Sequence, residues 1–248
     1  MRIPRIYTGQ DITAGTELQL DAGASQHIGR ALRMQAGDSL SLFNGSGREW
    51  PAHITSVDKK QTCVLPDQPV NGSPESPLAI HLAIAISRGD RMETVIQKST
   101  ELGVAAITPI ISERTEVRLK GERQKKKLLH WRQVIVSACE QCGRNTLPAL
   151  HTPRLVEEWL DQSDAQLRFV LHHRGDKGLN PEVHPSSVDL LIGPEGGLSE
   201  EEIATAQKKG FQPLTLGPRV LRTETAPLAT IAILQAHWGD MNPGGSGG

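Results

Sequence analysis

The sequence has little of three things that would place it in a specialised class: cysteine, long apolar runs and net charge. Its three cysteines, Cys63, Cys139 and Cys142, are too few for a disulfide framework and indicate a reducing compartment. No apolar run approaches the roughly 20 residues that a membrane-spanning helix needs. The opening MRIPRIYTGQ lacks the apolar stretch of a signal peptide. We therefore expect a cytoplasmic protein with no membrane partner.

Several familiar binding motifs are also missing. No Gly-x-Gly-x-x-Gly opens a helix after a strand, and no Gly-Lys-Ser/Thr occurs, which disfavours a dinucleotide-binding fold and a P-loop. Cys139 and Cys142 have Cys-x-x-Cys spacing without a second cysteine pair, so we expect two packed thiols on one helix face. The histidines form no His-Glu-x-x-His motif. The sequence predicts no metal site.

Charge is nearly balanced, with a formal net charge of −1, but it is unevenly distributed. Between Glu113 and Arg132 there are eight Lys or Arg residues and three Glu residues, so this segment is basic. A basic segment on an otherwise acidic chain is typical of a phosphate contact with nucleic acid. It is also compatible with the solvated face of a surface helix.

A segment rich in Pro, Gly and Ser, residues 69–77, separates two regions of different pattern and is predicted to be an interdomain linker. Residues 1–70 carry short alternating stretches between Gly, Asp and Asn turns, which predicts a small β-barrel with a helical exception at residues 25–33. Residues 242–248 are predicted to be a flexible tail.

Residues 78–240 have the pattern of an α/β domain. Strands are predicted at residues 78–86, 104–111, 167–171, 188–192 and 214–216, with helices between them. The longest of these helices is predicted over residues 124–142. Strand and helix alternate, so the sheet should be mainly parallel.

Helix start and stop signals mark the same domain. Asp90 and Ser199 each precede a Glu by three residues, which is the spacing of a capping box. Gly103 and Gly210 are placed to end these two helices. Pro227 suits the first turn of the last helix.

Two glycine-bearing loops follow predicted strands. Gly-Pro-Glu-Gly-Gly occupies residues 193–197, and Gly-Pro-Arg-Val-Leu-Arg-Thr-Glu-Thr-Ala occupies residues 217–226. Ligands of open α/β sheets bind beyond the carboxyl ends of the strands. Glycine allows a ligand to approach the backbone and proline stiffens the loop, so such loops suit an adenine edge or a ribose. The plainer reading is a tight strand-to-helix turn in which glycine serves only the backbone geometry.

At these loops the chain resembles the RsmE family, the 16S rRNA (uracil-N3) methyltransferases of the SPOUT superfamily. The resemblance runs almost end to end. It includes residues 2–7, with Tyr7 where Phe is usual, and residues 27–33, with Ala31 in place of Val. Residues 89–93, 98, 101–103 and 140–144 match further elements. The two loop motifs are specific, whereas the N-terminal ones alone are weak.

The resemblance implies a fold and a function. Residues 78–240 should form a parallel-sheet SPOUT domain with a deep trefoil knot, and residues 1–70 a PUA-like RNA-binding barrel. The cofactor should be S-adenosylmethionine, and the chain should work as a homodimer. The substrate should be N3 of uridine 1498 of 16S rRNA, within the small ribosomal subunit.

Site residues follow from the loops and the resemblance. We predict cofactor contacts at Leu171, Ile192, Gly193, Gly197, Leu216, Gly217, Leu221, Thr223 and Ala226. Arg222 is a candidate to stabilise the uracil anion, with a salt bridge to Glu224 or Glu195 as the alternative. Glu195 is a candidate general base, although it could equally brace its own loop.

RNA contacts are predicted for the N-terminal region, because phosphates require cations. The candidates are Arg2, Arg5, His27, Arg30 and Arg33, and packing of His27 at a helix start is the alternative. Arg88, Arg91 and Arg144 are expected to face either RNA or a dimer partner, with a Glu140–Arg144 helix salt bridge as the plainer reading.

The sequence is compatible with two other functions. The first keeps the fold and methylates another RNA target, such as a ribose 2′-O of tRNA or 23S rRNA. The second is a non-catalytic RNA-binding assembly factor. The glycine loops favour an enzyme, because a protein that only binds RNA has no need of a pocket built from backbone.

Overall fold

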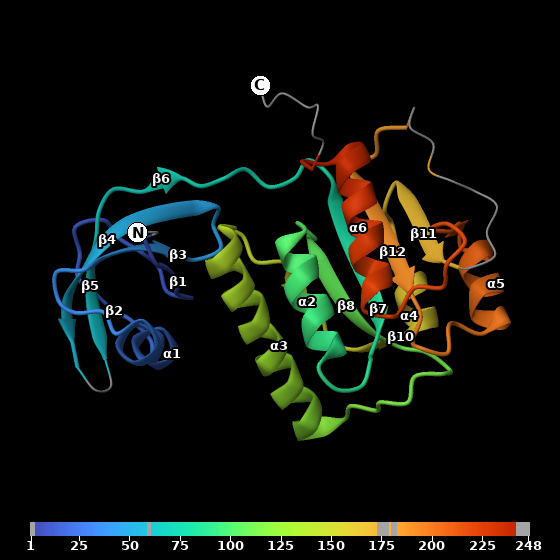
Figure 1. Ribbon diagram of the computed structural model, residues 1–248, viewed down its shortest axis with the longest axis horizontal. Coiled ribbons are helices and arrows are strands. Elements are labelled where there is room, and N and C mark those ends of the chain that lie inside the picture. Colours follow the sequence, from blue (N-terminus) through green and yellow to red (C-terminus); the bar gives the residue numbers. More distant parts are fainter. Residues whose placement is uncertain (1–2, 59–60, 173–178, 180–182, 242–248) are drawn as a thin grey trace. The chain divides into compact units, whose positions relative to one another are not determined.

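The computed structural model describes residues 3–58, 61–172, 179 and 183–241 (Figure 1). The chain divides into two compact units: Met1–Glu75 with Val136–Leu147, and Ser76–Ile135 with Pro148–Gly248. Arg2, two residues of the loop 58–61 and the predicted tail 242–248 lie outside the described residues. Among the helices that are described, none is both long and apolar enough to span a bilayer.

The first unit is built on a sheet with the strand order β1-β3-β4-β5-β2. Its strands are β1 (Arg5–Tyr7), β2 (Leu18–Gln19), β3 (Ser39–Phe43), β4 (Arg48–Val57) and β5 (Thr62–Pro66). Successive side chains of β4 point to opposite faces of the sheet, so Trp50, Ala52 and Ile54 are buried together on one face. They pack against a core that includes Ile6 and Val64. A helix, α1 (Ala22–Gln26), continues into a wide π-type turn (His27–Leu32), which ends at Arg33 with φ of 54°.

The second unit contains a parallel sheet with the order β10-β8-β7-β12-β11-β13, and β9 pairs with β8. Its strands are β7 (Ala79–Ala85), β8 (Ala106–Ile111), β9 (Ala149–Leu150), β10 (Arg154–Leu155), β11 (Leu167–Leu171), β12 (Ser187–Ile192) and β13 (Gln212–Leu214). Every strand pair in this sheet is parallel, as the alternating pattern predicts. Strands β7 and β12 lie at its centre and are almost entirely apolar and buried.

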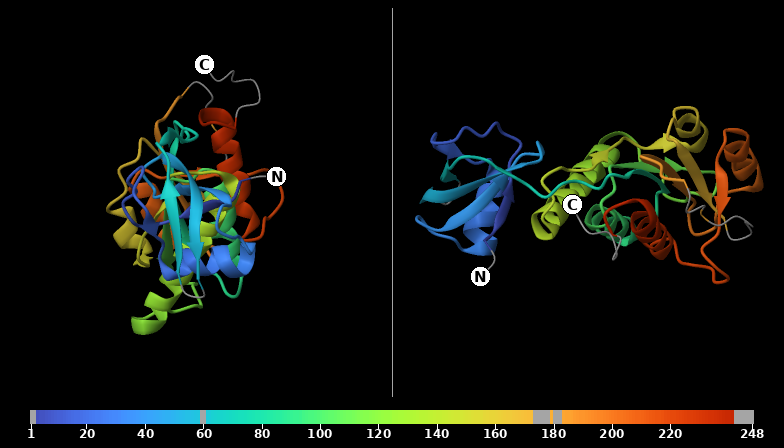
Figure 2. Two further views of the ribbon diagram at one scale, coloured as in Figure 1. Left: turned by 90° about the vertical axis from the view of Figure 1, so that its left-hand side faces the viewer. Right: turned by 90° about the horizontal axis from the view of Figure 1, so that it is seen from above.

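Five helices accompany this sheet: α2 (Arg91–Glu101), α3 (Gly121–Cys142), α4 (Val156–Leu160), α5 (Glu200–Lys208) and α6 (Thr225–Trp238). Helix α6 packs on α2 and β7, whereas α4 packs on α5. Figure 2 shows the first pair on one side of the sheet and the second pair on the other. The last residues of α3, from Val136 onward, belong to the first unit.

The predicted helix signals are confirmed at most positions. Ser199 accepts a hydrogen bond from the Glu202 amide at 3.2 Å, and Glu202 accepts one from the Ser199 amide at 2.8 Å, so this capping box is formed. Gly103 and Gly210 follow the ends of α2 and α5 with φ of 83° and 88°. Pro227 lies in the first turn of α6.

The capping box predicted at Asp90 is wrong. Asp90 has helical backbone angles, and its side chain makes no capping hydrogen bond. Glu93 is instead 3.0 Å from both Lys127 Nζ and His130 Nε2 of α3. The side chain that would complete the box is therefore engaged with another helix.

Several elements also differ from the predictions, and β9, β10 and α4 correspond to no predicted element. The predicted linker contains a short strand, β6 (Val70–Asn71), which pairs with the first two residues of β4. Helix α3 begins three residues earlier than predicted, at Gly121. The strand predicted over residues 214–216 is β13, which ends at Leu214 because its partner β11 ends opposite it at Leu171.

One polar cluster interrupts the apolar sheet. His81 Nε2 lies 2.7 Å from Thr108 Oγ1, and Asp189 on the neighbouring strand places Oδ1 3.6 Å from His81 Nδ1. Ser163 donates a hydrogen bond to the Asp189 carboxylate at 2.5 Å. Burial lowers the pKa of His81 to about 4, and the nearby His151 acts in the same direction. Burial raises the pKa of Asp189.

We predict that His81 makes the protein less stable in mild acid. The unfolded chain binds a proton on this imidazole below about pH 6.5, whereas the folded protein does so only below about 4, so folding opposes protonation between these values. The free energy of unfolding should fall by about 2–3 kcal/mol more in the parent than in His81→Gln as the pH drops through this window. Urea unfolding at several pH values measures the difference. His53→Gln at an exposed position is the control, and equal pH slopes for the parent and His81→Gln would contradict the prediction.

Candidate functional site

The two glycine-bearing loops meet at one edge of the parallel sheet. One follows β12 and the other connects β13 to α6, and the carboxyl ends of parallel strands lie on the same edge. Together they enclose a cavity of about 430 Å³. All nine residues predicted to contact a cofactor line this cavity: Leu171, Ile192, Gly193, Gly197, Leu216, Gly217, Leu221, Thr223 and Ala226.

The loops depend on glycine at specific positions. A Cβ on Gly193 would lie 2.7 Å from the Leu198 amide nitrogen and 3.0 Å from the Gly197 carbonyl carbon, so the backbone leaves no room for a side chain. Gly197 and Gly217 have φ of 70° and 79°, in the left-handed region that favours glycine. These residues leave the cavity lined by exposed backbone and by apolar side chains such as Leu216 and Leu221.

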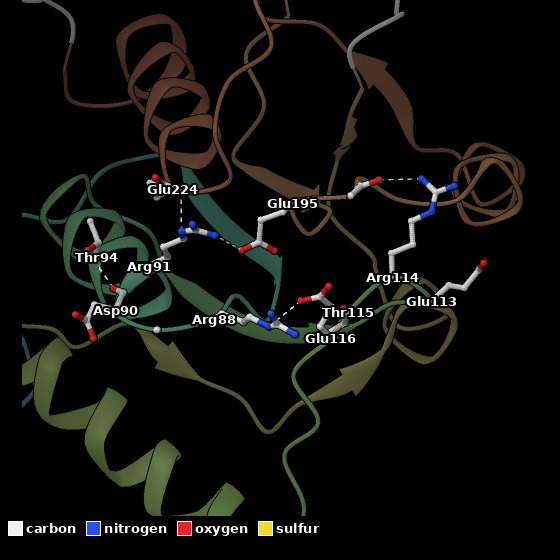
Figure 3. Close-up of a pocket in the computed structure, with 12 residues that line it drawn as sticks. Arg88, Asp90, Arg91, Thr94, Glu113, Arg114, Thr115, Glu116, Glu195 and Glu224 are labelled. Carbon is white, nitrogen blue, oxygen red and sulfur yellow. Dashed lines mark hydrogen bonds and ion pairs between the residues drawn. The ribbon is translucent and has the colours of Figure 1, made fainter.

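Arg114 holds the first loop from outside. It follows β8, and its Nη1 donates hydrogen bonds to the carbonyl oxygens of Gly196 and Leu198 at 2.8 and 3.4 Å (Figure 3). The neighbouring Glu113 amide donates to Glu202 Oε1 at 2.9 Å, which ties the same segment to α5. Sequence reasoning missed Arg114. Its position just after a third parallel strand is the signal that would have identified it.

Arg91, at the start of α2, links the two loops. Its Nη1 donates to Glu195 Oε1 at 2.7 Å in the first loop, and its Nε lies 3.9 Å from Glu224 Oε2 in the second (Figure 3). The Arg91 and Glu195 side chains are each 43% exposed, so solvent weakens this attraction. The ion pair nevertheless fixes the direction of the Glu195 carboxylate, as expected for a residue that braces its loop.

Arg222 is exposed, between the cavity-lining residues Leu221 and Thr223. Within the described part of the chain its side chain forms no hydrogen bond or ion pair, while Glu195 and Glu224 pair with Arg91. The alternative salt bridge of Arg222 to either glutamate is therefore not formed among these residues. Its guanidinium remains available to a ligand.

A second cavity, of about 940 Å³, adjoins the first and shares Arg114, Glu195 and Gly196 with it (Figure 3). Its wall is densely charged: Arg88, Arg91 and Arg114 face it together with Asp90, Glu113, Glu116, Glu195 and Glu224. Arg88 pairs with Glu116 at 2.7 Å. A polar substrate beside the first cavity would therefore meet charges of both signs.

The predicted RNA-binding residues of the first unit differ in accessibility. His27, Arg30 and Arg33 are exposed on or just after the π-type turn. The Arg5 side chain is only 9% exposed, because its guanidinium donates to Glu49, Asn145 and the Arg144 carbonyl and lies over the Phe43 ring. The Arg5 side chain is therefore packed within its own unit, and its contact with phosphate stays a prediction. Arg2 lies outside the described residues.

The end of α3 contributes to the same packing. Glu140 accepts a hydrogen bond from the Tyr7 amide at 3.1 Å, and burial raises the pKa of its carboxyl. Arg144 pairs with Glu75 at 2.5 Å. Cys139 is buried, which raises its thiol pKa to about 12, and Cys142 is half-buried. The described residues contain no group of three or more His, Cys, Asp or Glu that could hold a metal ion.

Comparison with known proteins covers both units. Residues 74–235 match the family described as the RNA methyltransferase domain, and residues 20–66 match the RNA methyltransferase PUA domain. The Ribosomal RNA small subunit methyltransferase E of Buchnera aphidicola (subsp. Schizaphis graminum) is 36% identical over 244 residues, covering 97% of this chain and 99% of that protein.

Two solved structures are similar over nearly the whole chain. A methyltransferase of Legionella pneumophila, solved with the bound cofactor SAM, has a TM-score of 0.93 and 46% identity, covering 97% of this chain and 100% of that one. A Ribosomal RNA small subunit methyltransferase E of Neisseria gonorrhoeae, bound to S-adenosyl methionine, has a TM-score of 0.91 and 38% identity over the same shares.

We predict that Gly193→Ala destabilises the protein whereas Gly196→Ala does not. The new methyl group at Gly193 would press against backbone that cannot move independently, at a cost of about 1–3 kcal/mol. At Gly196 it would meet only the Arg114 Cδ and Cβ atoms at 3.5 and 3.7 Å, which is ordinary contact. Urea unfolding followed by circular dichroism measures both variants. Equal losses of stability would contradict this account of the loop.

Proposed function

Because the chain belongs to the Ribosomal RNA small subunit methyltransferase E family of RNA methyltransferases, we propose that it methylates N3 of uridine 1498 in 16S rRNA, using S-adenosylmethionine. The observation that carries this proposal is the cavity of about 430 Å³ in which the loops after β12 and β13 meet. The proposed substrate is the assembled small subunit.

The cavity wall suits the proposed cofactor. Glycine at 193, 197 and 217 leaves backbone amides and carbonyls accessible for the polar edge of a nucleoside. Leu216 and Leu221 supply apolar surface for an adenine ring, and the Thr223 hydroxyl is positioned to add a hydrogen bond. When bound, S-adenosylmethionine supplies an electrophilic methyl group. These nine lining residues would bind and orient it.

Arg222 is the residue we assign to charge stabilisation. Uracil N3 carries a proton at neutral pH and must lose it before or during attack, which leaves negative charge on O2 and O4. A guanidinium that is exposed, unpaired within the described residues and directly beside the cavity is suited to stabilise that charge. As a general base, Glu195 would first have to break its pair with Arg91, so the pairing favours its bracing role.

The remaining parts of the proposal concern assembly. We assign RNA binding to the PUA-like region, residues 1–70, through Arg2, His27, Arg30 and Arg33, and methyl transfer to residues 78–240. Membership of the family supports a trefoil knot in the second region, a homodimer and a cytoplasmic location. We propose no catalytic role for residues 242–248.

The proposal is tested by methyl transfer from labelled S-adenosylmethionine to small subunits that lack the modification, followed by nucleoside mass spectrometry. We expect one methyl group at uracil N3 and little transfer to naked 16S rRNA, tRNA or 23S rRNA. Methylation of a ribose 2′-O would support the alternative target. Failure to bind both the cofactor and its demethylated product in calorimetry would overturn the proposal.

Replacing Arg222 should separate catalysis from cofactor binding. Arg222→Ala is expected to lower kcat about 10²–10³-fold, the usual effect of losing one group that stabilises a developing oxyanion. The Kd for S-adenosylmethionine should remain close to the parent value, because Arg222 does not line the cofactor cavity. Arg222→Lys keeps the cation and should recover part of the rate. An unchanged kcat in Arg222→Ala would rule out this role.

A further inference from the structure

A third cavity, of about 460 Å³, lies at the end of β7 and the start of α2, and neither the loops nor the proposed chemistry uses it. It shares Arg88, Gly89, Asp90 and Glu116 with the charged cavity, which in turn shares residues with the cofactor cavity. The three cavities therefore adjoin one another in series at the carboxyl edge of the sheet.

The wall of this third cavity is predominantly cationic. Arg88, Arg118, Arg123 and Lys127 line it, against the two carboxylates Asp90 and Glu116. Arg88 pairs with Glu116, and Lys127 pairs with Glu93 outside the cavity. Arg118 and Arg123 are exposed and form no ion pair or hydrogen bond among the described residues, so two guanidinium groups are uncompensated. Three cations of the basic segment Glu113–Arg132, namely Arg118, Arg123 and Lys127, thus line one cavity.

Two buried polar atoms here have no partner among the described residues. Ser87 is 5% exposed and its Oγ makes no hydrogen bond, and Trp131 is 1% exposed and its Nε1 makes none. Both residues line the cavity. Buried polar groups are almost always paired, and an indole N–H can only donate, so it requires an acceptor atom. These unpaired groups point to a ligand that carries hydrogen-bond acceptors.

The start of α2 adds a further preference for negative charge. Asp90 does not cap this helix of 11 residues with its side chain, and the first amides of the helix have no side-chain acceptor within the part of the chain that the structure describes. Helix N-termini of this kind favour anions. The apolar lining residues Met92, Val117 and Leu119 provide a surface for a less polar part of the same ligand.

We propose that this cavity binds one nucleotide of the RNA strand next to the target base, with its phosphate held by Arg118 and Arg123. The inference rests on the proposed function, because it assumes an RNA substrate. The volume exceeds what a lone phosphate requires and falls within the range of small-molecule sites. The charged cavity lies between this cavity and the cofactor cavity and shares lining residues with both, which favours a strand that continues toward the methyl-transfer site over a separate soluble anion.

The first test removes the two cations. Arg118→Ala/Arg123→Ala should raise KM for small subunits about tenfold and reduce the slope of log affinity against log salt by about one to two. Its Kd for S-adenosylmethionine should stay at the parent value, because neither residue lines the cofactor cavity. Lys208→Ala/Lys209→Ala removes the same charge outside all three cavities and serves as the control.

The second test observes the cavity directly. The indole N–H resonance of Trp131, assigned with Trp131→Phe, should shift when a short oligoribonucleotide is added. Inorganic phosphate at the same total phosphate concentration should shift it much less. Equal responses to both would overturn the RNA assignment in favour of a small-anion site.

Different results would contradict the proposed function and the proposed nucleotide site. If the parent neither binds S-adenosylmethionine nor methylates small subunits, the proposed function fails. If the parent methylates normally but Arg118→Ala/Arg123→Ala matches the control in KM and salt slope, the proposed nucleotide site is wrong. An indole resonance that does not move with the oligoribonucleotide would lead to the same conclusion.

Discussion

Parallel pairing of β12 with β7 on one side and β11 on the other is the constraint from which the rest of the second unit follows. Strands β7 and β12 are almost entirely buried, which is typical of the centre of a parallel sheet covered on both faces. Because all strands run the same way, every loop that follows a carboxyl end emerges at one edge. The loops after β12 and β13 are neighbours for this reason, although they are separated in sequence by a whole helix.

A pocket lined by glycine backbone has little rigidity of its own, because glycine has the widest conformational freedom. The structure supplies rigidity from outside the loops. Arg114 holds two carbonyl groups of the first loop, Arg91 bridges the first loop to the second, and Ser199 with Glu202 caps the helix that follows. Such bracing fixes the wall of the cavity, as precise ligand placement requires.

The charge of the lining residues differs from one cavity to the next along that edge, although the chain as a whole is nearly neutral. The cofactor cavity is lined mostly by apolar and glycine residues, the adjoining cavity has charges of both signs, and the third is mainly cationic. A net charge of −1 therefore reveals little about a nucleic-acid partner. The local excess of cations between Glu113 and Arg132 is more informative, because phosphate attraction depends on the field at the binding surface.

The sequence by itself determined the central strands of the parallel sheet and the two loops, because buried apolar runs, capping spacing and glycine positions are local signals. The nine residues that it predicted to contact the cofactor all line the cavity, together with others that it did not predict, such as Arg114 and Arg219. Only the tertiary structure decided the roles of Arg5, Arg91 and Arg114, because an arginine looks the same in sequence whether it faces phosphate, or a carboxylate or backbone carbonyl 44 or more residues away. The ends of β13 and the pairing of β6 were likewise set by partner strands, which no local pattern records. The sequence marked where a ligand could approach the backbone, and long-range pairing determined what holds that backbone in place.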